Sequence, residues 1–151
     1  MDKNDRTERG RKLLDEMLGS EGAERTLKHW QEICPDFGEY VTEFLAGEIW
    51  SRPGLDRRTK SLVTIATTAA MGRTRALALN IRMATNNGAT RQEIVETLLQ
   101  LAPYAGFPAC WEGLAVAHTV FRELEQLQGP SQNNSAVSDA QNLKDSEDLD
   151  A

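Results

Sequence analysis

Apolar residues recur every three or four positions along most of the chain, which is the spacing of amphipathic helices. The first 50 residues hold three such segments, predicted as helices over 8–18, 20–34 and 36–50. Asp36 and Glu39 have the spacing of a capping box for the third of these helices. No segment shows the period-2 alternation of a half-buried strand, so the pattern predicts an all-α fold.

A turn separates these helices from the rest of the chain. In SRPGLD, Pro53 and Gly54 suit the central positions of a type II turn, and Asp56 suits the N-cap of a helix that runs to Met71. We expect this turn to join the two halves of the helical region.

Three more helices are predicted after Met71. The stretch from Gly72 to Glu93, GRTRALALNIRMATNNGATRQE, indicates a helix with a stop at its NNG segment. Thr90 and Glu93 have capping-box spacing for the next helix, which Pro103 is expected to end. The last helix is predicted over about 109–126, with His118 on its apolar stripe.

The segment RTKSLVTIATTAAMG carries no charge between Lys60 and Arg73. Its polar positions, Ser61, Thr64 and Thr68, lie at i, i+3 and i+7. Because a surface helix normally turns charged residues to water, this helix is expected to be covered on both sides. One cover is the core and the other is a pocket or a second subunit, unless the segment is simply a core helix.

Length and charge place the helices in one domain. The 151 residues carry a formal net charge of −6, and residues 129–151 hold five acidic side chains against one lysine. We predict a helical domain over 1–128 and an acidic, disordered tail over 129–151, because the tail is poor in large apolar residues. The body has no basic patch for nucleic acid and no apolar run long enough for a membrane span, so a soluble, cytoplasmic protein is expected.

Cys34 and Cys110 are far apart and lack the CxxC or Cys/His spacing of a zinc or redox site. Both are interpreted as buried thiols. We therefore predict neither a metal nor an organic cofactor.

Three long stretches carry a family resemblance. GEIWSRPGLDRRTKSLVTIA, ALALNIRMATNNGATRQEIVETLLQ and YAGFPA resemble the carboxymuconolactone decarboxylase family, within the alkylhydroperoxidase D-like superfamily, over residues 6–126. The resemblance implies an alkylhydroperoxidase D-like helical fold. It also implies trimers or hexamers whose subunit contacts help to enclose the active site. The implied reaction is the cofactor-free loss of carbon dioxide from γ-carboxymuconolactone, a small carboxylated molecule of aromatic compound metabolism.

The peroxidase branch of that superfamily uses a Glu, a CxxC and a His. Those positions fall here on Ser61, Arg73, Ala76 and Asn80, so no thiol pair exists for peroxide reduction. The decarboxylase branch keeps the His at the position of Asn80. An asparagine still donates hydrogen bonds to a developing oxyanion, but it does not act as an acid.

Glu48 is the first candidate for the missing acid, because the apolar neighbours in its helix would desolvate a carboxyl group and keep it protonated. The alternative is a helix-end Glu paired with Arg52 or Arg57. His118 is a second candidate donor, or else a core histidine. Arg73 shares a helix face with Asn80 and either holds a substrate carboxylate or is solvated.

Aromatic and basic residues complete the candidate site. Trp50, Tyr104 and Phe107 are expected as pocket walls or as core residues. Arg52 and Arg57 are expected either to bind a substrate carboxylate or to tie subunits together.

Three functions remain open from the sequence. The first is decarboxylation of a carboxylated lactone with Asn80 as an orienting donor. The second is isomerisation or cyclisation of an aromatic or polyketide-derived substrate in a biosynthetic pathway. The third is a non-catalytic, oligomeric binding module.

Overall fold

The computed structural model describes residues 2–129 of the chain. The chain divides into two compact units, Met1–Val120 and Phe121–Ala151. The described part of the second unit is the end of the last helix. No strand occurs in the described range, so the all-α prediction is confirmed there. The predicted acidic tail, apart from Gly129, lies outside the described residues.

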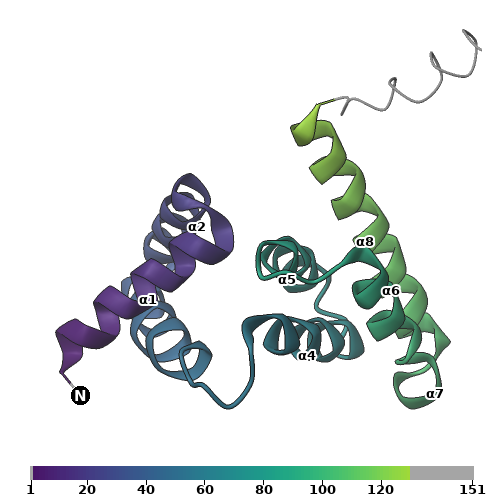
Figure 1. The fold of residues 1–151 in the computed structure, drawn as a ribbon, viewed down its shortest axis with the longest axis horizontal. Coiled ribbons are helices and arrows are strands. Elements are labelled where there is room, and N and C mark those ends of the chain that lie inside the picture. Colours follow the sequence, from purple (N-terminus) through teal and green to yellow (C-terminus); the bar gives the residue numbers. More distant parts are fainter. Residues whose placement is uncertain (1, 130–151) are drawn as a thin grey trace, which may run out of the picture. The chain divides into compact units, whose positions relative to one another are not determined.

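Nine helical segments follow one another across this range (Figure 1). They are α1 (Lys3–Leu18), α2 (Ser20–Ile33), α3 (Pro35–Tyr40), η1 (Val41–Trp50), α4 (Arg57–Ala70), α5 (Thr74–Asn86), α6 (Arg91–Leu99), α7 (Ala102–Ala105) and α8 (Phe107–Gln128).

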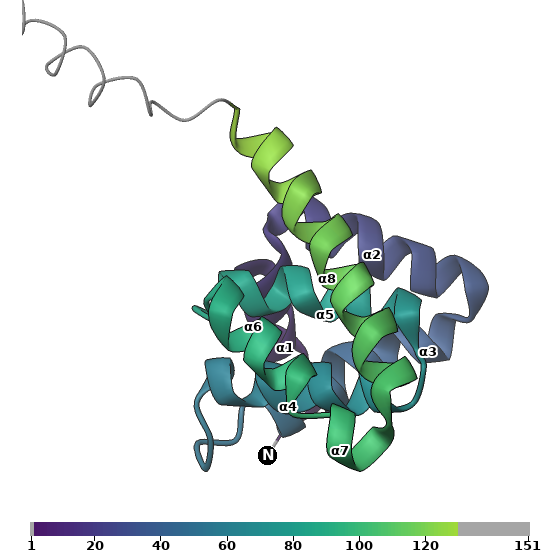
Figure 2. The same ribbon diagram turned by 90° about the vertical axis from the view of Figure 1, so that its right-hand side faces the viewer.

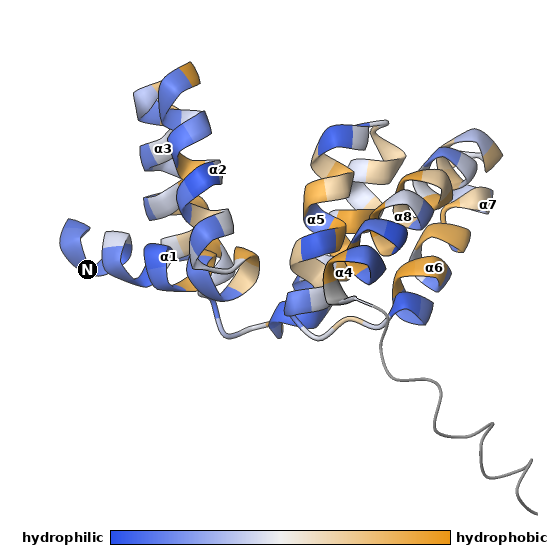
Figure 3. Cartoon of the chain, turned by 90° about the horizontal axis from the view of Figure 1, so that it is seen from above, coloured by the Kyte–Doolittle hydropathy of each residue, from blue (hydrophilic) through white to orange (hydrophobic). Residues whose placement is uncertain are grey.

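The N-terminal helices are hydrophilic over much of their surface, and α4, α5 and α6 carry more of the hydrophobic positions (Figure 3). Helix α1 starts earlier than the apolar pattern predicts. It stops at Gly19, whose φ of 74° lies in the region that favours glycine, and α2 begins at the next residue.

The predicted third helix is two segments. Cys34 is the N-cap of α3 and Pro35 takes the first helical position, so the predicted capping box of Asp36 and Glu39 does not form. From Val41 to Trp50 the chain is a π-helix, η1. The Ser51 hydroxyl donates to the Ala46 carbonyl five residues back, at 2.8 Å, which fits this wider winding.

Helix α1 packs closely along η1. A Cβ on Gly10 would lie 1.9 Å from the Thr42 carbonyl oxygen, and one on Gly47 would lie 2.3 Å from the Arg6 carbonyl oxygen. The two backbones therefore touch where neither residue has a side chain. This contact runs along η1 from Thr42 to Gly47, close to Trp50 at the end of the helix.

The core of this region gathers apolar side chains from four helices. The buried members are Leu13, Leu14, Met17, Ala23, Ala46 and Met83, with Trp50 and Leu79 partly buried against them. Met83 and Leu79 come from α5, so α5 links the N-terminal helices to the later ones.

Helices α4 to α7 and the part of α8 up to Val120 form the rest of the first unit. Helix α4 packs against α5 and α6, and the largest fully buried side chains here include Ile65, Ile81 and Leu98. A Cβ on Gly113 of α8 would meet Leu98 of α6 and Ala69 of α4, so α8 crosses both closely (Figure 2).

Local capping chemistry explains where α6 begins. The Thr90 side chain accepts from the Glu93 N–H, and the Glu93 carboxylate accepts from the Thr90 N–H, which confirms the capping box. That backbone hydrogen bond holds the pKa of Glu93 below its ordinary value. Helix α6 ends at Leu99, before the predicted stop, and Pro103 instead lies in the first turn of α7.

Candidate active site

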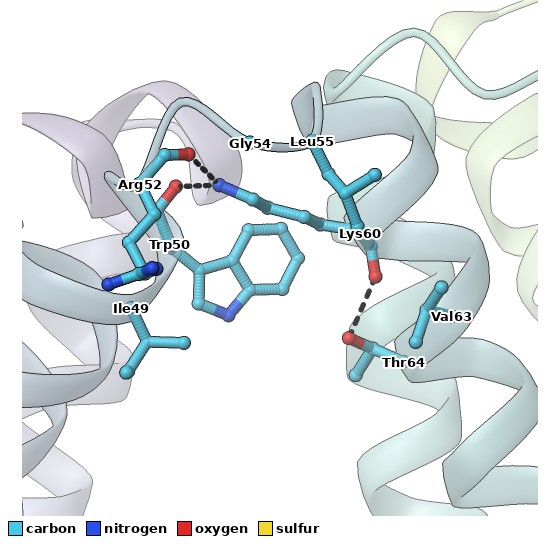
Figure 4. A pocket seen from close by; sticks show the side chains of 8 residues that line it. All are labelled: Ile49, Trp50, Arg52, Gly54, Leu55, Lys60, Val63 and Thr64. Carbon is cyan, nitrogen blue, oxygen red and sulfur yellow. Dashed lines mark hydrogen bonds between the residues drawn. The ribbon is translucent and has the colours of Figure 1, made fainter.

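A pocket of about 430 Å³ opens between the end of η1, the turn that follows it, and α4 (Figure 4). Other hollows of comparable size, on α1 and α2, are lined mainly by charged residues. Eight residues line the pocket beside η1: Ile49, Trp50, Arg52, Gly54, Leu55, Lys60, Val63 and Thr64. Apolar walls with two cationic side chains suit a small organic anion.

The turn that borders this pocket begins at the end of η1 and stops at the cap of α4. The Asp56 carboxylate accepts from the Thr59 N–H at 2.9 Å and from the Thr59 hydroxyl at 2.7 Å, which confirms Asp56 as the N-cap. The backbone hydrogen bond from Thr59 holds the pKa of Asp56 below its ordinary value. Gly54 does not take a positive φ, so the predicted type II turn is wrong.

Two predicted residues, Trp50 and Arg52, line the pocket together. Trp50 is also partly buried against the N-terminal core, so it serves both as a wall and as a core residue. Arg52 is exposed.

Lys60 and Thr64 also line the pocket, although sequence reasoning did not select them. The Lys60 ammonium donates to the Trp50 carbonyl at 2.7 Å and to the Arg52 carbonyl. With Val63 they stand at i, i+3 and i+4 on one face of α4. That spacing, which starts at the last charge before the uncharged run, is the signal that could have identified them.

Asn80 lies on α5, outside the lining of this pocket. Its side-chain amide donates to the Ala76 carbonyl at 2.8 Å, which leaves its second N–H and its oxygen for other partners. Asn80 is partly buried, while Ala76 and Arg73 are exposed. Ala76 and Asn80 lie one turn apart on α5, whereas Arg73 is the N-cap before the helix, so the face shared with Arg73 stays a prediction.

Glu48 differs from its predicted surroundings. Its side chain is 42% exposed, and its carboxylate pairs with Arg6 of α1 at 3.4 Å instead of with Arg52 or Arg57. It does not belong to the pocket lining. The expectation of a fully desolvated carboxyl group is therefore wrong for the single chain, because η1 turns this residue toward α1. Arg57 pairs with Glu16 of α1.

Tyr104 and His118 are separate from the pocket. Tyr104 is 81% exposed on α7, and His118 is exposed on α8. The predicted buried stripe on α8 is rotated: its buried positions before Phe121 are Cys110, Gly113, Ala117 and Val120. An exposed His118 is not a core histidine.

The two cysteines have different environments. Cys110 is buried as predicted, whereas Cys34 is exposed at the N-cap of α3, so its predicted burial is wrong. Within residues 2–129, no cluster of three His, Cys, Asp or Glu side chains could hold a metal ion. None of the helices described is long and apolar enough to cross a membrane.

The uncharged helix α4 is covered on one side. Ser61, Ile65 and Ala69 are buried, whereas Val63 is 55% exposed and Met71, just after the helix, is 61% exposed. Its hydroxyl groups donate to carbonyls of the preceding turn, as Thr64 does to Lys60 at 2.9 Å. One of the second covers predicted for this helix, a pocket, lies against Val63 and Thr64. A covering subunit stays a prediction.

Comparison with known proteins gives a consistent family. A family model described as "Carboxymuconolactone decarboxylase family" matches residues 35–119. The chain is 39% identical to the 4-carboxymuconolactone decarboxylase of Acinetobacter baylyi over 124 residues, which cover 82% of this chain and 92% of that protein.

Two further relatives extend the match. The chain is 36% identical to a nitrosuccinic acid decarboxylase of Metarhizium robertsii over 115 residues, covering 76% of this chain and 80% of the relative. It is 30% identical over 132 residues to an uncharacterized 15.0 kDa protein of Paracoccus denitrificans, covering 80% and 98%.

Proposed function

Because the chain belongs to the carboxymuconolactone decarboxylase family, we propose that it is a decarboxylase of a small carboxylated lactone or a related acid. The observation that carries this proposal is the 39% identity across 92% of the length of a 4-carboxymuconolactone decarboxylase. We also propose that the helices adopt the alkylhydroperoxidase D-like arrangement and that the reaction needs no cofactor.

The names of two relatives share one chemical requirement. Loss of carbon dioxide from 4-carboxymuconolactone, the γ-carboxymuconolactone of the sequence expectation, breaks a carbon–carbon bond and sends its electron pair toward the lactone carbonyl. In nitrosuccinic acid a nitro group next to a carboxylate accepts the pair in the same way. Each reaction places negative charge on oxygen and then returns a proton to carbon. Hydrogen-bond donors that face this oxygen stabilise the transition state.

The pocket beside η1 supplies the binding part of the proposal. Trp50 and Leu55 offer an apolar surface to a small ring, and the Arg52 guanidinium offers a bidentate partner for a carboxylate that stays on the substrate. The two relatives named as decarboxylases both act on acids, which fits this charge.

Asn80 supplies the proposed oxyanion donor. Its second N–H would face the oxygen of a substrate beside α5, and Arg73, the N-cap of α5, would add a second cation there. Glu48 stays the predicted donor of the proton to carbon, and its carboxylate pairs with Arg6 in the single chain. Tyr104 and His118 are exposed groups that contribute only if a neighbouring subunit brings them to the site.

We propose a homo-oligomer, a trimer or hexamer, for the same reason. Large apolar side chains are exposed along α3, η1 and α4, and a second copy would bury them. Assembly would also bring open positions such as Asn80 and Tyr104 against residues of another copy. The isomerase or cyclase and the non-catalytic module receive no support from the names of the relatives.

The proposal is tested with the purified full-length protein after dialysis against a chelator. 4-Carboxymuconolactone and nitrosuccinic acid are supplied side by side, and loss of each is followed by chromatography. We expect one acid to be consumed with a kcat/KM at least a hundredfold above that of the other, without added cofactor. Consumption of neither acid, or activity that returns only on adding a metal ion, would reject the proposal.

A further inference from the structure

Helix η1 ends at Trp50 and leaves backbone carbonyls at its C-terminus without partners in the helix. Lys60, in the first turn of α4, reaches back to the last of these carbonyls, at Trp50, and to the Arg52 carbonyl in the turn that follows η1. Its Nζ donates to the Trp50 carbonyl at 2.7 Å and to the Arg52 carbonyl (Figure 4). Hydrogen bonds from a charged donor are stronger than neutral ones, and a cation is favourable at a helix C-terminus.

The two carbonyls belong to the residues whose side chains face the proposed substrate. Few other bonds hold this part of the chain: the Arg52 N–H donates to the Ile49 carbonyl at a long 3.3 Å, and the Ser51 hydroxyl bonds back into η1. The aliphatic stem of Lys60 lines the same pocket from the α4 side. One side chain therefore ties both walls together.

We propose that Lys60 is a positioning residue that fixes Trp50 and Arg52 for substrate binding. The inference rests on the proposed function, because it assumes that the pocket beside η1 takes the acid. The Lys60 ammonium donates its hydrogen bonds to backbone carbonyls, so Arg52 is the cation that contacts the substrate carboxylate. Loss of the Lys60 ammonium frees the turn, so the effect falls on binding more than on the chemical step.

The kinetic test compares Lys60→Met, which keeps the stem and removes the donors, with Lys60→Arg, which keeps a charged donor. Lys60→Met should raise KM about tenfold, a change equivalent to about 1.4 kcal/mol, and leave kcat within about twofold. Lys60→Arg should recover most of the loss. An unchanged KM in Lys60→Met would overturn the proposal.

A double-mutant cycle separates positioning from general destabilisation. Arg52→Gln removes the guanidinium but keeps the backbone carbonyl that Lys60 holds. If Lys60 acts through Arg52, then Lys60→Met adds little to KM in the Arg52→Gln protein. Additive effects of the two substitutions would overturn the proposed link.

A spectroscopic readout does not depend on activity. The chain has three tryptophans, and Trp30→Phe with Trp111→Phe leaves Trp50 as the single reporter. In that protein, Lys60→Met should increase acrylamide quenching of Trp50, whereas Lys60→Arg should not. Equal quenching in all three proteins contradicts the positioning role. If neither acid is consumed but quenching changes as expected, the proposed function is rejected, and the role of Lys60 in positioning Trp50 is retained.

Discussion

At the scale of single residues, the candidate site divides into two groups. Trp50, Arg52 and Lys60 meet in one pocket, because the end of η1 and the start of α4 are joined by a short turn. Asn80 lies on α5, where its amide bonds to its own helix and keeps one N–H free. The chemistry that we propose needs both groups, one for binding the acid and one for the charge that develops on oxygen.

The sequence located part of this site and missed part of it. Trp50 and Arg52 were found because they lie beside a turn, in a stretch that resembles the carboxymuconolactone decarboxylase family. Lys60 was missed, since its role comes from bonds to carbonyls that only the folded turn presents. Glu48 was placed among apolar neighbours along the sequence, whereas the π-helical winding of η1 directs it to Arg6 of α1.

The role of Glu48 is predicted from a matched pair of variants. If Glu48 delivers the proton, Glu48→Gln lowers kcat about a hundredfold or more, while Arg6→Gln leaves kcat within about threefold. Both variants lose the same partly exposed ion pair, so their stabilities should change by similar, small amounts. Steady-state kinetics and thermal melts measure the two effects. Full activity in Glu48→Gln would exclude Glu48 as the proton donor and leave it only its ion pair with Arg6 of α1.

At the scale of elements, local signals predicted what local chemistry decides. Asp56 and the Thr90–Glu93 box start α4 and α6 as expected, since each cap involves residues within three positions. The split of the third helix into α3 and η1 was not predicted. Helix η1 lies against α1, a distant part of the sequence, where Gly10 and Gly47 let the two backbones approach closely.

The close approach of α1 and η1 predicts the effect of adding one methyl group. Gly10→Ala would place a Cβ 1.9 Å from the Thr42 carbonyl oxygen, a backbone atom that moves only with its helix. We expect a loss of at least ~2 kcal/mol in the free energy of unfolding. Gly22→Ala is the control, because its Cβ would meet only the Leu18 Cβ at 3.5 Å. That variant should gain ~0.5–1 kcal/mol. Equal denaturation midpoints for the two variants would argue against this packing.

The cap of α4 predicts a dependence of stability on pH. The hydrogen bond from the Thr59 N–H lowers the pKa of Asp56 in the folded protein, so its contribution is complete above the ordinary value of 3.8. The contribution is lost as pH falls through the lower folded pKa. Asp56→Asn keeps a capping side chain without the charge. The natural protein should therefore melt higher than Asp56→Asn at pH 6, and the two melting temperatures should converge toward pH 2.5. A constant difference across this range would exclude the proposed linkage.

At the scale of the whole molecule, the single chain leaves large apolar side chains of α3, η1 and α4 exposed. They include Phe37, Tyr40, Phe44, Val63 and, just after α4, Met71, each between 47% and 68% exposed. Sequence alone predicted that a pocket or a second subunit would cover the other side of α4, and the pocket beside η1 lies against Val63 and Thr64. The proposed contact with a second copy involves residues of another chain, so no pattern within one chain specifies it.

The oligomer prediction follows from these exposed apolar side chains. Light scattering of the natural protein at micromolar concentration should give three or six times the chain mass, and a chain ending at Gln128 should give the same multiple. Phe44→Glu and Val63→Glu should lower the multiple, because they place charge in an apolar contact. Glu24→Gln, a substitution of an exposed charged residue on α2, is the control. A monomeric natural protein would contradict the prediction.

The most direct test of the central claim is carbon dioxide release from whichever of the two acids the protein consumes faster. We expect one carbon dioxide per molecule consumed, and a turnover about a hundredfold to a thousandfold lower in Asn80→Leu. Asn80→His should raise turnover on 4-carboxymuconolactone. A product that retains every carboxyl group, or no carbon dioxide above the blank, would contradict the account.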